Sequence, residues 1–490
     1  MGVALVSTGI VGLDLVLGGG LPRNRIYLVQ GDPGVGKTTL GMQFLRAGLA
    51  AGERCLYIAL SETRSEISAV VESHGWSLDG LELIELSAID QSVGLETENT
   101  LFEPSEVELQ ETTRRLLAEI ERVRPDRVVF DSLSELRLLA QTPLRYRRQI
   151  LALKQYFGDK HTSVLLLDDR TSDPTDLQLQ SLAHGVVALE QAPPLYGADR
   201  RRLRIAKLRG MKFLSGHHDF AIRTGGIEVF PRLVPTEHRS AFSRVQMASG
   251  ITALDQMLRG GIDRGTSALI LGPAGSGKSS IAVQYAIAAA QRGERAALFV
   301  FDERIATVYE RSRALGLELE ALVTSGALVL QQVDPAELSA GEFAHRVRAA
   351  VDHEGCQLVA IDSLNGYLHA MASEKQLSVQ LHELLAYLGN SGVATLMVMA
   401  QHGLTAVTHA PIDISYLADT LILLRYFEAD GRIRKAISVL KRRSGAHEES
   451  IRELSMGPGG IIVGRSLTQF HGVLTGTPHY VGAPGDLSRE

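Results

Sequence analysis

The sequence of this 490-residue chain contains the same pattern twice. The stretch TGIVGLDLVLGGG, which starts at Thr8, is matched by SGITALDQMLRGG, which starts at Ser249. Further along, VVFDSLSEL is matched by LVAIDSLNG, and KLRG by KRRS, with nearly the same separation. Length alone would suggest about three domains. The duplication instead predicts two homologous domains.

The junction is expected where the repeated pattern is interrupted. The segment FPRLVPTEHRSAFSRVQ, at 230–246, contains two prolines and mixed charges, which favour a linker. We therefore assign residues 1–235 to the first domain and residues 236–490 to the second.

Within each copy, short apolar runs rich in β-branched residues alternate with longer helical patterns. In the first copy we expect strands at 26–31, 54–60, 127–132 and 163–169, and helices at 38–51 and 106–124. Apolar strands that alternate with helices are typical of a mostly parallel sheet covered by helices on both faces. The later runs GVVALEQ and RRLRIAKLRG favour antiparallel edge strands. The predicted fold class is α/β in both domains.

Each copy carries the motif GxxxxGK[ST] between an apolar strand and a helix, which is the context of a phosphate-binding P-loop. The glycines let backbone N–H groups converge on phosphate oxygens, and the helix amino terminus adds a partial positive charge. Lys37 and Lys278 are expected to reach the β- and γ-phosphates of ATP. The predicted nucleotide-binding residues are Gly31, Asp32, Pro33, Gly34, Val35, Gly36, Lys37, Thr38 and Thr39 in the first copy, and Gly272, Pro273, Ala274, Gly275, Ser276, Gly277, Lys278, Ser279 and Ser280 in the second.

An aspartate ends a later apolar strand in each copy, Asp131 after RVVF and Asp362 after LVAI. A single aspartate at a strand end is usually a cap or a turn residue. Here its spacing from the P-loop recurs, so we expect it to hold Mg²⁺ through water, together with the hydroxyl of Thr38 or of Ser279.

An acidic residue also follows the second strand of each copy, in Ser61-Glu62 and in Asp302-Glu303. Hydrolysis of a phosphoanhydride needs a carboxylate that orients and deprotonates the attacking water. We predict that Glu62 and Glu303 are these catalytic residues. The alternative is an ordinary helix cap, because acids suit helix amino termini.

A basic pair lies near the end of each copy: Lys207 and Arg209 in KLRG, and Lys441 and Arg443 in KRRS. Two cations with one residue between them on a strand point the same way, so both could contact one phosphate. They are far in sequence from their own P-loop. We predict that they bind the nucleotide of a neighbouring subunit, as arginine fingers do, with a solvated edge strand as the alternative.

Together, the tandem P-loops, the acidic residues after the second strand and the KLRG element resemble the KaiC family of clock ATPases and its wider bacterial relatives. The resemblance covers about residues 5–480, and its most specific part is the segment 418–454. It implies two tandem RecA-like P-loop NTPase domains, which assemble as a double-ring homohexamer with ATP bound between subunits. It also implies a slow ATPase in the first domain, an autokinase and autophosphatase in the second, and partners such as KaiB-like proteins that read the state of the ring.

Two departures from the family pattern modify these expectations. The family phosphorylates an adjacent serine and threonine, and the matching residues here are Ser415 and Tyr416. We therefore predict Ser415 as the phosphosite, without an ordered two-site cycle. If the first acid after the second strand is the autokinase base, Asp302 serves there; its side chain is one methylene shorter than the family's glutamate, which predicts slow autophosphorylation.

Two other functions share this core. A RecA/RadA-like DNA-dependent ATPase is disfavoured by the net charge of -6 and by the lack of a basic tail, so we do not expect nucleic acid as a partner. The second alternative is a structural scaffold that bound ATP stabilises. The sequence also has no apolar run near 18 residues and no charged n-region at its start, which predicts a cytoplasmic protein without a membrane partner.

Overall fold

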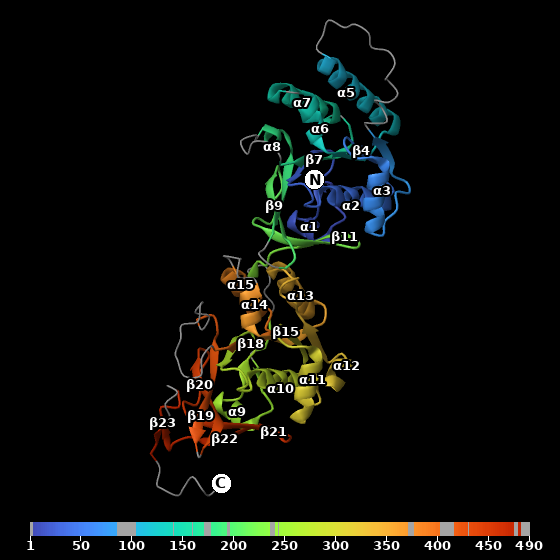
Figure 1. The fold of residues 1–490 in the computed structure, drawn as a ribbon. Coiled ribbons are helices and arrows are strands. Elements are labelled where there is room, and N and C mark those ends of the chain that lie inside the picture. The colour runs from blue at the N-terminus through green and yellow to red at the C-terminus, as the bar shows by residue number, and fades with distance from the viewer. Residues whose placement is uncertain are drawn as a thin grey trace. The chain divides into compact units, whose positions relative to one another are not determined.

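The computed structural model describes residues 3–85, 104–140, 142–158, 160–170, 178–193, 197–235, 241–243, 245–370, 377–401, 416–429, 431–474 and 479–481. The chain forms two compact units, Met1–Arg232 and Leu233–Glu490 (Figure 1). Each contains a mixed sheet with helices on both faces. The predicted α/β fold is thereby confirmed.

The sheet of the first unit has the strand order β11-β10-β9-β8-β3-β7-β6-β4-β5. Its strands are β3 (Ile26–Gly31), β4 (Cys55–Ala59), β5 (Glu82–Glu85), β6 (Arg127–Asp131), β7 (Ser163–Asp169), β8 (Gly185–Ala192), β9 (Arg200–Leu208), β10 (His218–Arg223) and β11 (Gly226–Phe230). The helices are α1 (Val11–Val16), α2 (Lys37–Ala50), α3 (Arg64–Ser73), α5 (Pro104–Val123), α6 (Leu133–Ala140), α7 (Pro143–Gly158) and α8 (Gln178–Leu182), and β1 (Leu5–Val6) pairs with β2 (Leu21–Pro22).

The second unit repeats this plan with the order β16-β15-β17-β18-β14-β19-β20-β21-β22. Its strands are β14 (Ser267–Gly272), β15 (Arg295–Val300), β16 (Leu328–Gln332), β17 (Cys356–Asp362), β18 (Ala394–Ala400), β19 (Thr420–Ala429), β20 (Arg432–Arg442), β21 (Arg452–Gly457) and β22 (Gly460–Ser466). The helices are α9 (Thr252–Met257), α10 (Lys278–Gln291), α11 (Ile305–Ala314), α12 (Leu319–Thr324), α13 (Ala340–Asp352), α14 (Leu364–Ala370) and α15 (Leu377–Asn390), with the small pairs β12 (Gln246–Met247) and β13 (Ile262–Asp263), and β23 (Phe470–His471) and β24 (His479–Tyr480).

The strand that leads into each P-loop lies inside the sheet and is buried on both faces. In the first unit Val29 packs into the core shared with α2, whereas its neighbour Leu28 packs into the core on the opposite face. Side chains alternate along a strand, so a continuous apolar run fills both cores. Because β3 is parallel to β6 and β7, their carboxyl ends meet at one edge, and the P-loop is built there.

The chain after these parallel strands turns antiparallel, as the sequence predicts, but the prediction that β8 and β9 are edge strands is wrong, because β10 and β11 extend the sheet beyond them. Strand β8 pairs with β9, and β19 with β20, in antiparallel registers that extend each sheet beyond the P-loop strand. Among the described residues, no helix is both long enough and apolar enough to cross a membrane.

Candidate functional site

Each P-loop ends in a glycine with a left-handed backbone. Gly36 and Gly277 are the N-cap residues of α2 and α10, both with φ of 108° and neither with a side chain that caps the helix. A Cβ atom at Gly36 would lie 2.7 Å from Ile222 Cδ1 of β10, and one at Gly277 would lie 1.9 Å from Met456 Cε of β21. The first N–H groups of both helices are therefore left for an outside acceptor. Such uncapped amino termini fit the phosphate groups of a nucleotide.

The two P-loop lysines lie in different electrostatic surroundings. Lys37 is buried, donates hydrogen bonds to the carbonyls of Gly31 at 3.0 Å and Asp32 at 2.9 Å, and pairs with the Asp169 carboxylate at 2.6 Å. Lys278 donates to the carbonyl of Pro273 at 2.7 Å, and burial lowers its pKa. The residue equivalent to Asp169 in the second unit is Ala400, since both lie opposite the last residue of the P-loop strand.

The Asp169 carboxylate lies at the end of the neighbouring strand β7, beside the first P-loop. Burial opposes its ionisation, but hydrogen bonds from Lys37 and Ser134 lower its pKa below that of an ordinary aspartate. Only the first unit thus carries a fixed negative charge at this position beside its P-loop lysine.

The hydroxyl and the carboxylate predicted to hold Mg²⁺ lie together in both units. Thr38 Oγ1 donates to Asp131 Oδ2 at 2.6 Å, and the Tyr57 hydroxyl donates to the same oxygen at 2.5 Å. In the second unit Ser279 is hydrogen-bonded to Asp362. Burial raises the pKa of both aspartates. Paired hydroxyl and carboxylate oxygens at the end of a P-loop are a donor set that fits Mg²⁺.

The acidic residues after the second strand differ between the units. Glu62 has a buried Oε2 atom without a hydrogen-bond partner among the described residues, and burial, followed by the charge of Asp131, raises its pKa. Glu303 instead forms an ion pair with Arg311 of α11. The Asp302 carboxylate accepts a hydrogen bond from the hydroxyl of Ser363. The position equivalent to Arg311 in the first unit is Val70.

Both residues of each basic pair bond to the same neighbouring segment. Lys207 Nζ donates to the carbonyl of Gln180 at 2.6 Å, and Arg209 donates to the carbonyl of Ser181 at 2.9 Å. In the second unit Lys441 donates to the carbonyl of Ala418 at 2.9 Å and Arg443 to that of Tyr416 at 2.7 Å. Each pair points in one direction, toward the chain segment that precedes β8 or β19.

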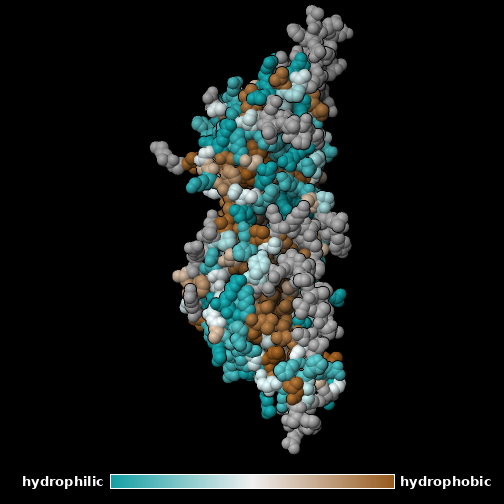
Figure 2. All heavy atoms as spheres, turned by 90° about the vertical axis from the view of Figure 1, so that its left-hand side faces the viewer, coloured by the Kyte–Doolittle hydropathy of each residue, from teal (hydrophilic) through white to brown (hydrophobic). Residues whose placement is uncertain are grey.

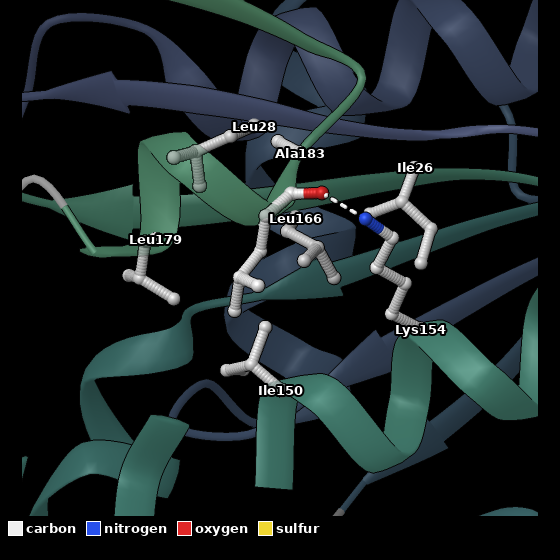
Figure 3. A pocket seen from close by; sticks show the side chains of 8 residues that line it. Ile26, Leu28, Ile150, Lys154, Leu166, Leu179 and Ala183 are labelled. Carbon is white, nitrogen blue, oxygen red and sulfur yellow. Dashed lines mark hydrogen bonds between the residues drawn. The ribbon is translucent and has the colours of Figure 1, made fainter. Parts of the chain in front are cut away.

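A third cation joins the pair of the first unit. Lys154 of α7 donates to the carbonyl of Leu182 at 2.8 Å, at the carboxyl end of α8 (Figure 3). This bond lies beside a small apolar pocket between α7, α8 and the sheet, which is lined by Ile26, Leu28, Ile150, Lys154, Leu166, Leu179, Leu182 and Ala183. The carboxyl end of α8 therefore collects three cations, which its exposed carbonyls favour.

Polar side chains connect α8 to the interior of the first unit. Arg137 of α6 pairs with Asp168 at 2.8 Å, Gln30 donates to Asp168 at 3.0 Å, and Gln180 of α8 donates to Gln30 at 2.8 Å. The residues equivalent to Gln30 and Asp168 in the second unit are Leu271 and Met399, which pack in an apolar core.

The surfaces of the two units also differ in hydropathy. On the face that Figure 2 shows, hydrophobic residues gather over the second unit, while the first unit has a mixed surface.

Sequence reasoning missed three contributors to these sites: Asp169, Arg311 and Lys154. The acidic end of the strand SVLLLDD could have revealed Asp169 by the same reasoning that identified Asp131. Arg311 and Lys154 lie on helices with other charged residues and carry no local signal. The predicted phosphosite Ser415 lies outside the described residues, and its neighbour Tyr416 is exposed.

A P-loop between a buried strand and an uncapped helix, with an aspartate at the end of a neighbouring parallel strand, defines a P-loop NTPase, and this chain contains two of them in tandem. The family model described as "ATPase: KaiC" matches residues 6–234 and 247–468. The chain therefore belongs to the KaiC ATPase family.

Curated relatives agree over the whole length. The circadian clock oscillator protein KaiC of Parathermosynechococcus lividus is 27% identical over 100% of this chain and 91% of its own length. The protein of the same name from Thermostichus vulcanus is 27% identical over 97% of this chain and 92% of its own. The circadian clock oscillator protein KaiC 1 of Synechocystis sp. is 26% identical over 100% of this chain and 95% of its own.

Proposed function

We propose that this protein hydrolyses ATP in its first domain, residues 1–235, and reports its nucleotide state to protein partners. The observation that carries the proposal is the contrast between the two acidic residues. Within the described part of the chain, Glu62 keeps one carboxylate oxygen without a hydrogen-bond partner, whereas Glu303 is held by Arg311. A general base must be able to accept a proton from water, and an ion pair with arginine opposes that.

The residues of the first P-loop have separate tasks in this proposal. The backbone N–H groups at Gly36 and Lys37 hold the phosphates, and the Lys37 ammonium bonds to the terminal one. Thr38 and Asp131 hold Mg²⁺, which neutralises charge on the transferred phosphoryl group when bound. Glu62 orients the attacking water and takes its proton. The equivalent residues Lys278, Ser279, Asp362 and Glu303 bind a second ATP with slower turnover.

The basic pairs complete each nucleotide site from a neighbouring subunit. Lys207 and Arg209 lie on the far side of the sheet strand β8 from their own P-loop, and carbonyls hold them in one direction. In a closed ring, the same surface of every subunit meets the P-loop of the next. We propose a cytoplasmic homohexamer in which Lys441 and Arg443 play the same part in the second domain, residues 236–490.

The second domain is proposed as a slow serine autokinase and autophosphatase. Ser415 is the acceptor and Asp302 the base that receives the hydroxyl proton, while Tyr416 occupies the position of the second acceptor. The hydrogen bond between Asp302 and Ser363 competes with that role, which supports slow transfer.

KaiB-like proteins are the proposed partners that recognise the resulting phosphorylation state. The comparisons give no support to a DNA-dependent ATPase of the RecA/RadA type.

A time course with γ-labelled ATP and Mg²⁺ tests these proposals, with released phosphate and protein-bound label counted together. Glu62→Gln should lose at least about 90% of phosphate release, because an amide cannot act as the base. Glu303→Gln is the matched control and should lose far less. Equal losses in the two variants, or none, would contradict the assignment of turnover to the first domain, and a wild type with negligible phosphate release would favour an ATP-stabilised scaffold.

The same experiment separates the autokinase. Label on the protein that disappears in Ser415→Ala supports self-phosphorylation at this residue. Label that persists in Ser415→Ala places the acceptor elsewhere, and no label at all leaves a ring that signals by nucleotide state alone.

A further inference from the structure

Arg425 of β19 is a buried cation. It is 6% exposed, and its Nε atom has no hydrogen-bond partner among the residues that the structure describes. Among the described residues, no carboxylate forms an ion pair with it. Burial alone lowers its pKa, with no acidic neighbour to oppose the shift. An arginine stays charged in proteins, so its burial carries a desolvation cost, and no ion pair among the described residues offsets that cost.

The register places Arg425 beside the second P-loop. Leu423 lies opposite Leu271 in the parallel pair of β19 with β14, so Arg425 extends past the end of β14 at Gly272. On the other side of β14, the backbone N–H of Gln401 donates to the carbonyl of Gly272 at 2.9 Å. Gln401 and Arg425 therefore flank the end of the P-loop strand from the sides of its two neighbours, β18 and β19.

Two more buried polar atoms at this end of the sheet lack partners. The Oε1 atom of Gln401 and the Oγ atom of Ser438 both lack a hydrogen bond within the part of the chain that the structure describes. Ser438 of β20 is 3% exposed and lies opposite Leu423, which places it on the same face of the sheet as Arg425. Most buried polar atoms in folded proteins have a partner, so three unpartnered groups in one corner call for a common explanation.

The first unit fills the equivalent corner with its own ion pairs. Arg170 donates its backbone N–H to Gly31 as Gln401 does to Gly272, and Arg204 lies opposite Ala188 as Ser438 lies opposite Leu423. The carboxylate between them belongs to Glu190, 3.9 Å from Arg170 and 3.5 Å from Arg204. Glu190 is the residue equivalent to Arg425, since the carbonyl of the preceding leucine lies against the P-loop glycine in both units.

We propose that Arg425 and Ser438 form an oxyanion site in the second unit, which takes from outside the carboxylate that the first unit supplies through Glu190. The guanidinium and the serine hydroxyl are donors of the kind that bind phosphate or carboxylate oxygens, whereas the unpartnered Oε1 atom of Gln401 is an acceptor and borders the site without donating to it. The oxyanion is either a free phosphate-type ion or an acidic side chain of a second copy of this chain. Both sources share the chemistry, and the experiment distinguishes them.

The test compares the full-length protein with Arg425→Gln and with the control Arg432→Gln, which removes an exposed arginine on the adjacent strand β20. Each is melted and titrated calorimetrically with inorganic phosphate, at constant ionic strength set with chloride. Phosphate bound to the P-loops contributes equally in all the proteins compared, so each phosphate response stated below is the part that exceeds this shared contribution. A free oxyanion predicts that phosphate raises the Tm of the wild type and of Arg432→Gln, and that Arg425→Gln loses this rise and binds at this site about tenfold more weakly or worse.

Removing an uncompensated buried charge should also raise the melting temperature of the protein. In phosphate-free buffer Arg425→Gln should melt at a higher temperature than the wild type, because the amide costs less to bury. An arginine that serves only packing would instead give a lower Tm and an unchanged phosphate response, which would overturn the proposal.

An acidic side chain of a second copy gives a different pattern. Phosphate then has little effect on the dilute wild type, while Arg425→Gln weakens self-association in sedimentation and Arg432→Gln does not. If neither phosphate binding nor self-association depends on Arg425, there is no oxyanion site. Should Arg425→Gln fail to fold, the triple variant Gln401→Arg, Arg425→Glu and Ser438→Arg restores the ion pairs of the first unit, and it should fold without any response to phosphate.

Discussion

In the function proposed above, the surroundings of one side chain, Glu62, assign ATP hydrolysis to the first half of the duplicated chain. Burial raises its pKa, while its counterpart Glu303 is paired with an arginine. A raised pKa means that the carboxylate is protonated at a higher pH than an ordinary glutamate would be. A base is active only when it is deprotonated.

We therefore predict that ATP hydrolysis falls as the pH is lowered through this raised pKa, with full activity retained above it. The acid limb of kcat/KM should lie above the pH at which an exposed glutamate titrates. A pH series at saturating Mg²⁺ checks this, with Glu62→Gln as the reference that should show no such limb. A rate that stays constant down to pH values near 4.3, the usual pKa of glutamate, would contradict the assignment.

Asp169 makes a second prediction at the scale of one residue. Its carboxylate holds Lys37 at 2.6 Å, so phosphate must compete for the same ammonium. Replacement by alanine, which the second unit has at this position, should tighten ATP binding to the first domain several-fold. The nucleotide-free protein should lose about 1–2 kcal/mol of stability, because the buried lysine loses its partner.

Binding of a non-hydrolysable ATP analogue and denaturant unfolding measure the two effects of Asp169→Ala. Asp199→Ala, at an exposed aspartate in the same unit, is the control and should change neither. Weaker binding in Asp169→Ala would show that the carboxylate assists the nucleotide instead of competing with it.

At the scale of elements, the strands and the helices were predictable because their periodicity is local. The run IYLVQG gives β3 at the expected residues, and the helix expected at 38–51 is α2 at Lys37–Ala50. Helix α8 was not predicted. Its five residues are held by Lys154, Lys207 and Gln30 from three other elements, and such long-range contacts leave no pattern in the segment itself.

The polar network beneath α8 predicts a non-additive pair of substitutions. Asp168→Met removes the carboxylate partner of Arg137 in a largely buried position and should cost about 2–3 kcal/mol of stability. Arg137→Leu combined with Asp168→Met removes both charges and should recover much of that loss. Urea unfolding of the two single variants and the double variant gives the coupling energy. Additive losses would show that the two side chains act independently.

At the scale of the molecule, the predicted site residues fall into two groups, which we propose meet between subunits. The P-loop, Asp131 and Glu62 lie at the carboxyl ends of the inner strands, whereas Lys207 lies on β9 and Arg209 directly follows that strand. The sequence predicted both groups, since each rests on a motif. The motifs carry no information about the charge partners Asp169 and Arg311, which depend on the packing of neighbouring elements.

If each nucleotide site is shared between two subunits, as we propose, two inactive variants should restore activity when they are mixed. Lys37→Ala and Arg209→Ala should each be inactive as uniform assemblies, because every first-domain site then lacks one component. Mixed assemblies contain some interfaces with an intact P-loop on one side and an intact Arg209 on the other, so part of the ATPase activity should return. Phosphate release from the mixed and the separate proteins is compared after subunit exchange. An inactive mixture in which exchange is verified would show that Arg209 acts within its own subunit.

Each P-loop packs against a strand from the carboxyl-terminal part of its own unit, which has a consequence for biosynthesis. Ile222 and Met456, which lie against Gly36 and Gly277, belong to β10 and β21, close to the end of their units. A chain emerging from the ribosome therefore exposes each GKT or GKS motif long before the strand that supports it has been made. Nucleotide capture in each half must wait until translation of that half is almost complete, so the first half is ready for ATP while the second is still being synthesised.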